Sequence, residues 1–127
     1  MEFVRPLEPI LIIDDSVEAR EYLGNILEEL GFEEVSGSED FESAKHLLEK
    51  NPPNLIFLDI ELPNTDGSGI LEYLNDHYPK SHVIMCSGHN SLECVQNTWE
   101  CGAKDFIEKP FNAKKVDTVL KRLELVT

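Results

Sequence analysis

The chain alternates short runs of apolar, β-branched residues with longer segments in which apolar residues recur every three or four positions. Runs of the first kind are typical of strands buried on both faces, and the longer period is typical of amphipathic helices. The strand-like runs lie at 10–13, 32–36, 55–58, 82–86 and 104–107. Strict alternation with short connections predicts a parallel sheet covered by helices on both faces. We therefore expect a single open α/β domain of about five strands and five helices.

The predicted helices have recognisable ends. Ser16 and Asp40 stand where the first two would begin, and both residue types are favoured N-caps. Gly31 and Asn51-Pro52-Pro53 stand where these helices would end. The helix expected at 91–101 is apolar on two faces, so it has either a wide buried face or an exposed partner surface that includes Trp99.

Length and composition exclude several classes of protein. The 127 residues suffice for one domain, and the formal net charge of −14 is unfavourable for binding nucleic acid. This charge suits a protein that holds a divalent cation or meets a basic partner. No apolar run is long enough to span a bilayer, and the first nine residues do not resemble a signal peptide. The spacing of the three cysteines indicates neither a disulfide framework nor a zinc site, and we expect a cytoplasmic location.

Reactive side chains stand where the predicted strands end. Asp14 and Asp15 follow the first strand, and Asp59 follows the third. Ser87 follows the fourth strand, and Lys109 lies just beyond the fifth. Ligands of open parallel sheets bind beyond the carboxyl ends of the strands. We therefore expect these five side chains to meet at one edge of the sheet.

This set of groups is suited to phosphoryl transfer. Clustered carboxylates repel one another unless a cation lies among them, and their oxygens are the ligands that Mg²⁺ prefers, with Mn²⁺ as a possible substitute. The lysine and the hydroxyl would hold the oxygens of a transferred phosphoryl group. An Asp-Asp pair alone could be a simple acidic helix cap, but the agreement at four strand ends favours a phosphoryl-transfer site.

The chain resembles the receiver domain of two-component response regulators, and chemotaxis regulators in particular. The matching stretches are residues 12–16, 58–63, 66–67, 86–88 and 102–111. The resemblance implies a flavodoxin-like fold, a doubly wound five-stranded parallel sheet with strand order 2-1-3-4-5. It also implies one receiver domain over 1–127, with an N-terminal tail at 1–8 and a core at 9–125.

The resemblance implies a role for each residue of the acidic cluster. Asp59 would be the phosphoacceptor, and Lys109 would pair with the phosphoryl oxygens. Asp15 and Asp59 would bind Mg²⁺ directly, together with the backbone carbonyl of Glu61. Asp14 would act on the metal mainly through water.

The resemblance also implies a switch next to the acidic cluster. Ser87 would bond the phosphoryl group in the active state, and Phe106 would be the aromatic switch residue that turns inward behind it. Phe106 lacks the hydroxyl of a switch tyrosine, which removes one hydrogen bond but not the packing. A cis peptide bond would precede Pro110. Glu61 and His89 would influence how long the phosphoryl group survives.

The function implied is a phosphorylation-activated switch, not an enzyme beyond its own phosphotransfer and slow dephosphorylation. Its partners would be a sensor histidine kinase or a phosphotransfer protein, and a downstream protein bound at the surface of the fourth helix, fifth strand and last helix. No contact with nucleic acid or membrane is expected. The domain would be a monomer or a phosphorylation-dependent dimer.

Two alternatives belong to other classes of protein. A Mg²⁺-dependent phosphohydrolase with an aspartyl intermediate would need a second acid two residues after the nucleophile, and Glu61 has that spacing. So short a chain leaves little room for a substrate-binding segment. The second alternative, a non-phosphorylated interaction module, would not need the intact set of acids. A dinucleotide-binding protein is excluded because the chain lacks both GxGxxG and GxxxxGK[ST].

Overall fold

The computed structural model describes residues 8–59, 62, 67–88 and 105–122, and within it a five-stranded parallel sheet forms the centre of the fold. The strand order is β2-β1-β3-β4-β5, which confirms the predicted doubly wound topology. The strands are β1 (Ile10–Ile13), β2 (Val35–Ser38), β3 (Leu55–Asp59), β4 (His82–Ser87) and β5 (Asp105–Glu108).

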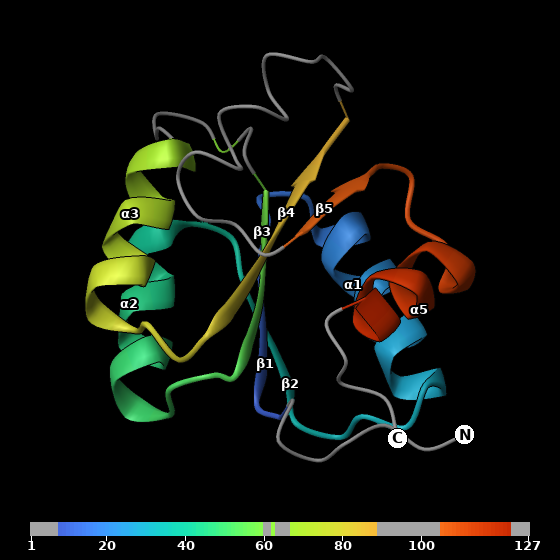
Figure 1. The fold of residues 1–127 in the computed structure, drawn as a ribbon, viewed down its shortest axis with the longest axis horizontal. Coiled ribbons are helices and arrows are strands. Elements are labelled where there is room, and N and C mark those ends of the chain that lie inside the picture. The colour runs from blue at the N-terminus through green and yellow to red at the C-terminus, as the bar shows by residue number, and fades with distance from the viewer. Residues whose placement is uncertain (1–7, 60–61, 63–66, 89–104, 123–127) are drawn as a thin grey trace.

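Helices cover both faces of the sheet. They are α1 (Val17–Glu29), α2 (Phe41–Lys50), α3 (Gly67–His77) and α5 (Ala113–Arg122). Figure 1 shows α2 and α3 on one side of the strands, and α1 and α5 on the other. The helix predicted at 91–101, with Trp99, lies outside the described residues. None of the described helices is both long and apolar enough to cross a bilayer.

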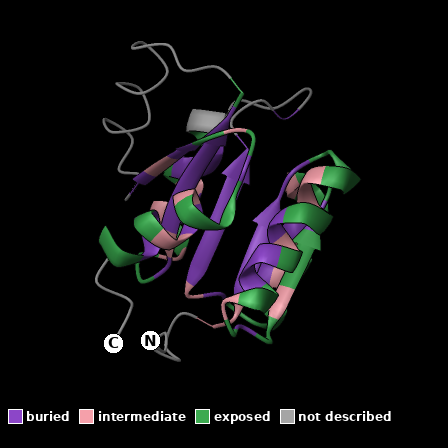
Figure 2. Cartoon of the chain, turned by 90° about the vertical axis from the view of Figure 1, so that its right-hand side faces the viewer, coloured by how far each residue is buried: buried purple, intermediate pink, exposed green. Residues whose placement is uncertain are grey.

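The side chains of the sheet supply two apolar cores because successive residues of a strand point to opposite faces. In β1, Ile10 and Ile12 pack with α1 and α5, whereas Leu11 and Ile13 pack with α2 and α3. Every residue of β1 and β3 is buried. Figure 2 shows buried strands between helices whose outer surfaces are exposed. This burial explains why both strands are continuous apolar runs in the sequence.

The predicted helix caps are present. The hydroxyl of Ser16 accepts a hydrogen bond from the backbone N–H of Ala19 at 3.2 Å. The carboxylate of Asp40 accepts one from the N–H of Ser43 at 2.8 Å. Each cap satisfies one of the donors that a helix leaves unpaired at its first turn.

The predicted bounds of three strands need correction. The second strand begins at Val35, not at residue 32, because Phe32 belongs to the C-terminal cap that follows α1. Gly31 adopts φ = 103°, and the N–H of Phe32 donates to the carbonyl of Leu27 at 3.1 Å, which is the pattern of a Schellman cap. The apolar side chain of Phe32 therefore joins the core without being in a strand. The fourth strand extends to Ser87, and the fifth covers Asp105–Glu108.

Candidate functional site

The structure brings the predicted acids together at the carboxyl edge of the sheet. One carboxylate oxygen each from Asp14, Asp15 and Asp59 lies within 4.8 Å of the other two. Asp14 and Asp59 are each only 2% exposed, whereas Asp15 is exposed to solvent. Three oxygens at this separation, one of them open to solvent, match the hard-ligand set of a small divalent cation.

The position of Asp14 is fixed by its backbone and by the start of α1. Its N–H donates to the carbonyl of Ser38 on β2 at 3.0 Å. Its carboxylate accepts a hydrogen bond from the N–H of Ser16 at 2.9 Å. Its carbonyl accepts one from Nη1 of Arg20 at 2.6 Å. A Cβ atom on Gly37 would lie 3.2 Å from Cδ of Arg20, so the glycine makes room for the arginine side chain.

Lys109 supplies a cation inside the acidic cluster. Its Nζ lies 2.8 Å from Oδ2 of Asp14 and 3.5 Å from Oδ2 of Asp59. Burial lowers the pKa of Lys109, but the hydrogen bond to Asp14 and the charges of Asp59 and Asp14 together outweigh burial and raise this pKa above its ordinary value. The ammonium group is therefore charged at neutral pH, where it compensates the two buried carboxylates.

The backbone around Lys109 is held on both sides. The N–H of Lys109 donates to the carbonyl of Ser87 at 2.7 Å, and the peptide bond from Lys109 to Pro110 is cis. Nζ of Lys115, on α5, donates to the carbonyls of Glu108 at 3.3 Å and Pro110 at 3.0 Å. These bonds connect the turn after β5 to both β4 and α5.

Ser87 and Phe106 lie on the neighbouring strands β4 and β5. Ser87, the last residue of β4, is fully buried. Phe106 on β5 is partly buried and packs against the core beneath α2 and α3. Cys86 precedes Ser87, and burial raises the pKa of its thiol, which keeps this group neutral. Glu61 and His89 lie outside the described residues, so their proposed roles stay predictions.

Two supporting residues were not found from the sequence. Arg20 contacts the backbone of Asp14, and Lys115 contacts the backbone of the turn that contains Pro110. Both donate to carbonyl groups, which every residue carries, so neither contact leaves a pattern of side chains in the sequence. The position of Arg20, one turn into the helix that follows Asp14, indicates its contact with Asp14 only weakly.

Comparison with known proteins agrees with this geometry. The family model of the response regulator receiver domain matches residues 10–121. The chain therefore belongs to the receiver domain family of two-component response regulators, as its motifs indicated. Members of this family are phosphorylation-dependent signalling switches and not enzymes that turn over a separate substrate. They interact with histidine kinases or phosphotransfer proteins and with downstream targets.

The relatives include NtrX-like regulators and chemotaxis proteins. A putative NtrX-like response regulator of Rickettsia bellii is 40% identical over 120 residues, which cover 93% of this chain and 25% of that protein. The chemotaxis protein CheY of Bacillus subtilis is 36% identical over 107 residues, which cover 84% of this chain and 89% of CheY. The chain thus spans about a quarter of the NtrX-like relatives and most of CheY.

The matching solved structures include relatives of both kinds. NtrX from Brucella abortus superimposes with a TM-score of 0.83 at 35% identity, over 96% of this chain and 26% of NtrX. CheY in a CheX–CheY–BeF3–Mg²⁺ complex from Borrelia burgdorferi superimposes with a TM-score of 0.83 at 29% identity, over 91% of this chain and 87% of that one.

Proposed function

We propose that this domain accepts a phosphoryl group on Asp59 from a sensor histidine kinase or a phosphotransfer protein. The observation that carries the proposal is the environment of Asp59. This carboxylate is buried at the end of the central strand β3, lies 3.5 Å from the ammonium of Lys109, and shares a cation-sized cluster with Asp14 and Asp15.

In the proposed reaction, a carboxylate oxygen of Asp59 attacks the phosphorus of a phosphohistidine. A P–O bond forms as the P–N bond breaks, and the imidazole of the donor leaves. The ammonium of Lys109 is already beside Asp59, so it would meet the developing negative charge without a large rearrangement. Burial of Asp59 lowers the local dielectric constant, which strengthens this electrostatic contribution.

Asp14, Asp15 and Asp59 would hold a divalent cation, Mg²⁺ or the chemically similar Mn²⁺. Asp15 and Asp59 would bind it directly together with the backbone carbonyl of Glu61, which lies outside the described residues, and Asp14 would act mainly through water. When bound, the metal supplies charge neutralisation for the phosphoryl oxygens. The oxygen donors of the cluster fit such a cation, and the related CheY complex from Borrelia burgdorferi contains Mg²⁺ together with BeF3.

The signal would be read at the surface of β5, α5 and the predicted fourth helix, which lies outside the described residues. Ser87 would donate a hydrogen bond from its hydroxyl to the phosphoryl group and would move toward it. Phe106 would then turn into the space that opens behind Ser87. Phe106 lines a groove of about 360 Å³ between β5 and α5, together with Lys115, Val119 and Arg122. Its ring packs on the side of the sheet that carries α2 and α3, so a change in its rotamer would alter the surface on that side of β5, which a downstream protein could contact.

The phosphoacceptor can be tested by intact mass. Incubation with Mg²⁺ and acetyl phosphate should add one phosphate to the wild-type protein and none to Asp59→Asn. Asp76→Asn, which changes an exposed acid on α3, is the matched control and should be modified normally. Phosphate that persists in Asp59→Asn, on a histidine for example, would contradict the assignment.

A further inference from the structure

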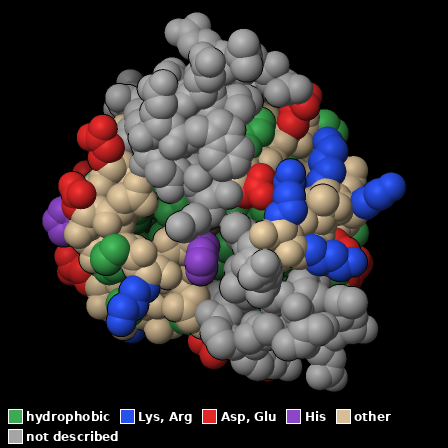
Figure 3. All heavy atoms as spheres, viewed as in Figure 1, with side chains coloured by type: hydrophobic (Ala, Val, Ile, Leu, Met, Phe, Trp, Pro, Cys, Tyr) green, Lys and Arg blue, Asp and Glu red, His purple; other side chains and the backbone are tan. Residues whose placement is uncertain are grey.

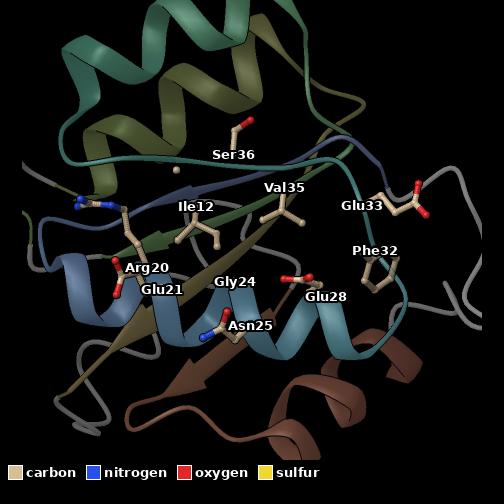
Figure 4. A pocket seen from close by; sticks show the side chains of 11 residues that line it. Ile12, Arg20, Glu21, Gly24, Asn25, Glu28, Phe32, Glu33, Val35 and Ser36 are labelled. Carbon is tan, nitrogen blue, oxygen red and sulfur yellow. The ribbon is translucent and has the colours of Figure 1, made fainter.

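A groove of about 770 Å³ lies between α1 and β2, on the side of the fold away from α2 and α3. Figure 4 shows Arg20, Glu21 and Glu28 on the helix side of this groove and Val35 on the strand side. The buried side chains of Ile12 and Phe32 also line it, and with Val35 they give the groove an apolar floor. Arg20 supports the backbone of Asp14 from here, but none of the residues proposed to bind the metal or the phosphoryl group lines this groove, so an inference about it goes beyond that function.

The strand beside the groove has an open edge. β2 is the outermost strand of the described sheet and pairs with β1 on one side. The carbonyl of Glu34 accepts a hydrogen bond from Ile10 of β1, and the carbonyl of Ser38 accepts one from Asp14, which directly follows β1. Because alternate residues of a parallel strand face opposite neighbours, the N–H and C=O groups of Val35 and Gly37 point away from β1. An edge of this kind can pair with an added strand.

On the helix side of the groove, Gly24 leaves one position without a side chain. A Cβ atom at this position would meet no heavy atom within 4 Å apart from its own helix and neighbours. Glycine inside a helix costs roughly 1 kcal/mol relative to alanine. No steric conflict with the described residues requires this glycine, and its effect is to leave space for a side chain that enters the groove.

The rim of the groove is acidic. Glu21, Glu28 and Glu33 line it and are all exposed to solvent. The basic residue there, Arg20, already donates Nη1 to the carbonyl of Asp14 at 2.6 Å. An apolar floor beneath an acidic rim complements a strand in which apolar and basic side chains alternate.

We propose that the groove between α1 and the open edge of β2 is a docking site for an extended basic segment of a partner protein. The segment pairs with the backbone of Val35 and Gly37. Its apolar side chains enter the groove near Gly24, and its lysine or arginine side chains face Glu21 and Glu28. Arg20 connects this groove to the backbone of Asp14, so the docked segment lies next to the phosphoryl-transfer site.

The probe for this proposal is a capped eight-residue peptide of alternating lysine and valine, titrated into the unphosphorylated ¹⁵N-labelled protein without Mg²⁺. We expect saturable amide shifts centred on Val35, Gly37 and Gly24, and slower hydrogen exchange at the first two. A peptide of alternating glutamate and valine should not bind. The lysine peptide with N-methyl groups on alternate amides keeps its charge but cannot pair along one edge, and it should bind at least tenfold more weakly.

Two substitutions at one position test whether the groove itself is used. Gly24→Tyr adds a large ring on the groove side, where its Cβ atom meets no heavy atom within 4 Å, and it should weaken binding of the lysine peptide at least tenfold. Gly24→Ala adds a single methyl group and leaves the groove open, so it should bind like the wild type. Circular dichroism of both variants checks that the helix is retained. Equal binding by Gly24→Tyr and the wild type would overturn the proposal.

Two charge variants test the role of the rim. The triple variant Glu21→Gln, Glu28→Gln and Glu33→Gln should weaken binding at least tenfold. A control with the same total charge changes exposed acids on the opposite face of the sheet, and it should bind normally. The control substitutions are Glu49→Gln, Glu72→Gln and Asp76→Asn. Equal losses in the two triple variants would show attraction by net charge only and overturn the proposal, as would shifts confined to α2 and α3. All these assays omit a phosphodonor, so their failure is distinct from a failure of phosphorylation at Asp59.

Discussion

At the scale of single residues, the site depends on one cation placed between two buried carboxylates. The side chains of Asp14 and Asp59 are each 3% exposed, and Nζ of Lys109 is within 4 Å of both. Two carboxylates without this ammonium would repel each other in a region where water screens them poorly. Lys109 therefore has a structural role in the metal-free protein as well as its proposed role in phosphoryl transfer.

Lys109→Met should destabilise the metal-free protein by about 3 kcal/mol, because it leaves two buried charges without their partner. Mg²⁺ should stabilise this variant more than the wild type, since a bound cation replaces the missing positive charge. Urea unfolding with EDTA and then with Mg²⁺ measures both effects. Lys114→Met, at an exposed position of α5, should change the free energy of unfolding by less than roughly 0.5 kcal/mol. Similar losses in the two variants would show that the acidic cluster does not depend on Lys109.

At the scale of elements, the start of α2 depends on a charged cap. The carboxylate of Asp40 accepts hydrogen bonds from the backbone and side chain of Ser43, and these bonds lower its pKa below the ordinary value of 3.8. A lowered folded-state pKa means that the stabilisation is fully present above the unfolded pKa and is lost as the pH falls through the folded one.

Asp40→Ala should therefore lower the free energy of unfolding at neutral pH, and its deficit relative to the wild type should shrink below about pH 3.8. Asp40→Asn keeps a good capping group without the charge, so it should retain most of the stability without this pH dependence. Ser16→Ala, at the uncharged cap of α1, should cost about 1 kcal/mol at every pH. Urea unfolding from neutral to acidic pH gives these differences. A deficit of Asp40→Ala that does not vary with pH would contradict the charged-cap interpretation.

The central strands could be predicted from the sequence because burial on both faces makes every position apolar. The edge strand β2 could not be placed correctly, because it is only partly buried and its residues, Val35–Ser38, include glycine and two serines. The nearby apolar residue Phe32 suggested a strand, but it is buried by the end of α1.

In the candidate site, the placement of the main side chains could be predicted from the sequence, but the contacts that support them could not. Once parallel strands are inferred, their carboxyl ends must meet, which places Asp14, Asp59 and Lys109 together. The hydrogen bonds of Arg20 and Lys115 to backbone carbonyls depend on the packing of helices against turns. Sequence spacing alone does not specify such contacts, because any carbonyl could have been the acceptor.

At the scale of the whole molecule, the site and the proposed output surface are connected through adjacent strands. Ser87 and Glu108 are in register across β4 and β5, and the carbonyl of Ser87 accepts the N–H of Lys109. Arg122 on α5 lies 3.1 Å from the carboxylate of Asp105 on β5. The chain is strongly acidic. On the face of the molecule drawn in Figure 3, however, most lysine and arginine side chains lie on the side of α1 and α5.

The connection between site and surface predicts a separation of phosphorylation from signalling in Ser87→Ala. Phosphorylation can shift an equilibrium only by its differential interaction with two states, which is typically about 1–3 kcal/mol. Removing the Ser87 hydroxyl removes a donor to the phosphoryl group but leaves Asp59 and Lys109 in place. The variant should still gain one phosphate by intact mass, yet lose most of the amide shifts that BeF3 and Mg²⁺ produce over residues 105–122 in the wild type. Ser81→Ala, which removes another buried hydroxyl just before β4, should keep those shifts. A full response in Ser87→Ala, or wild-type shifts confined to residues around Asp59, would show that the signal does not pass through this serine.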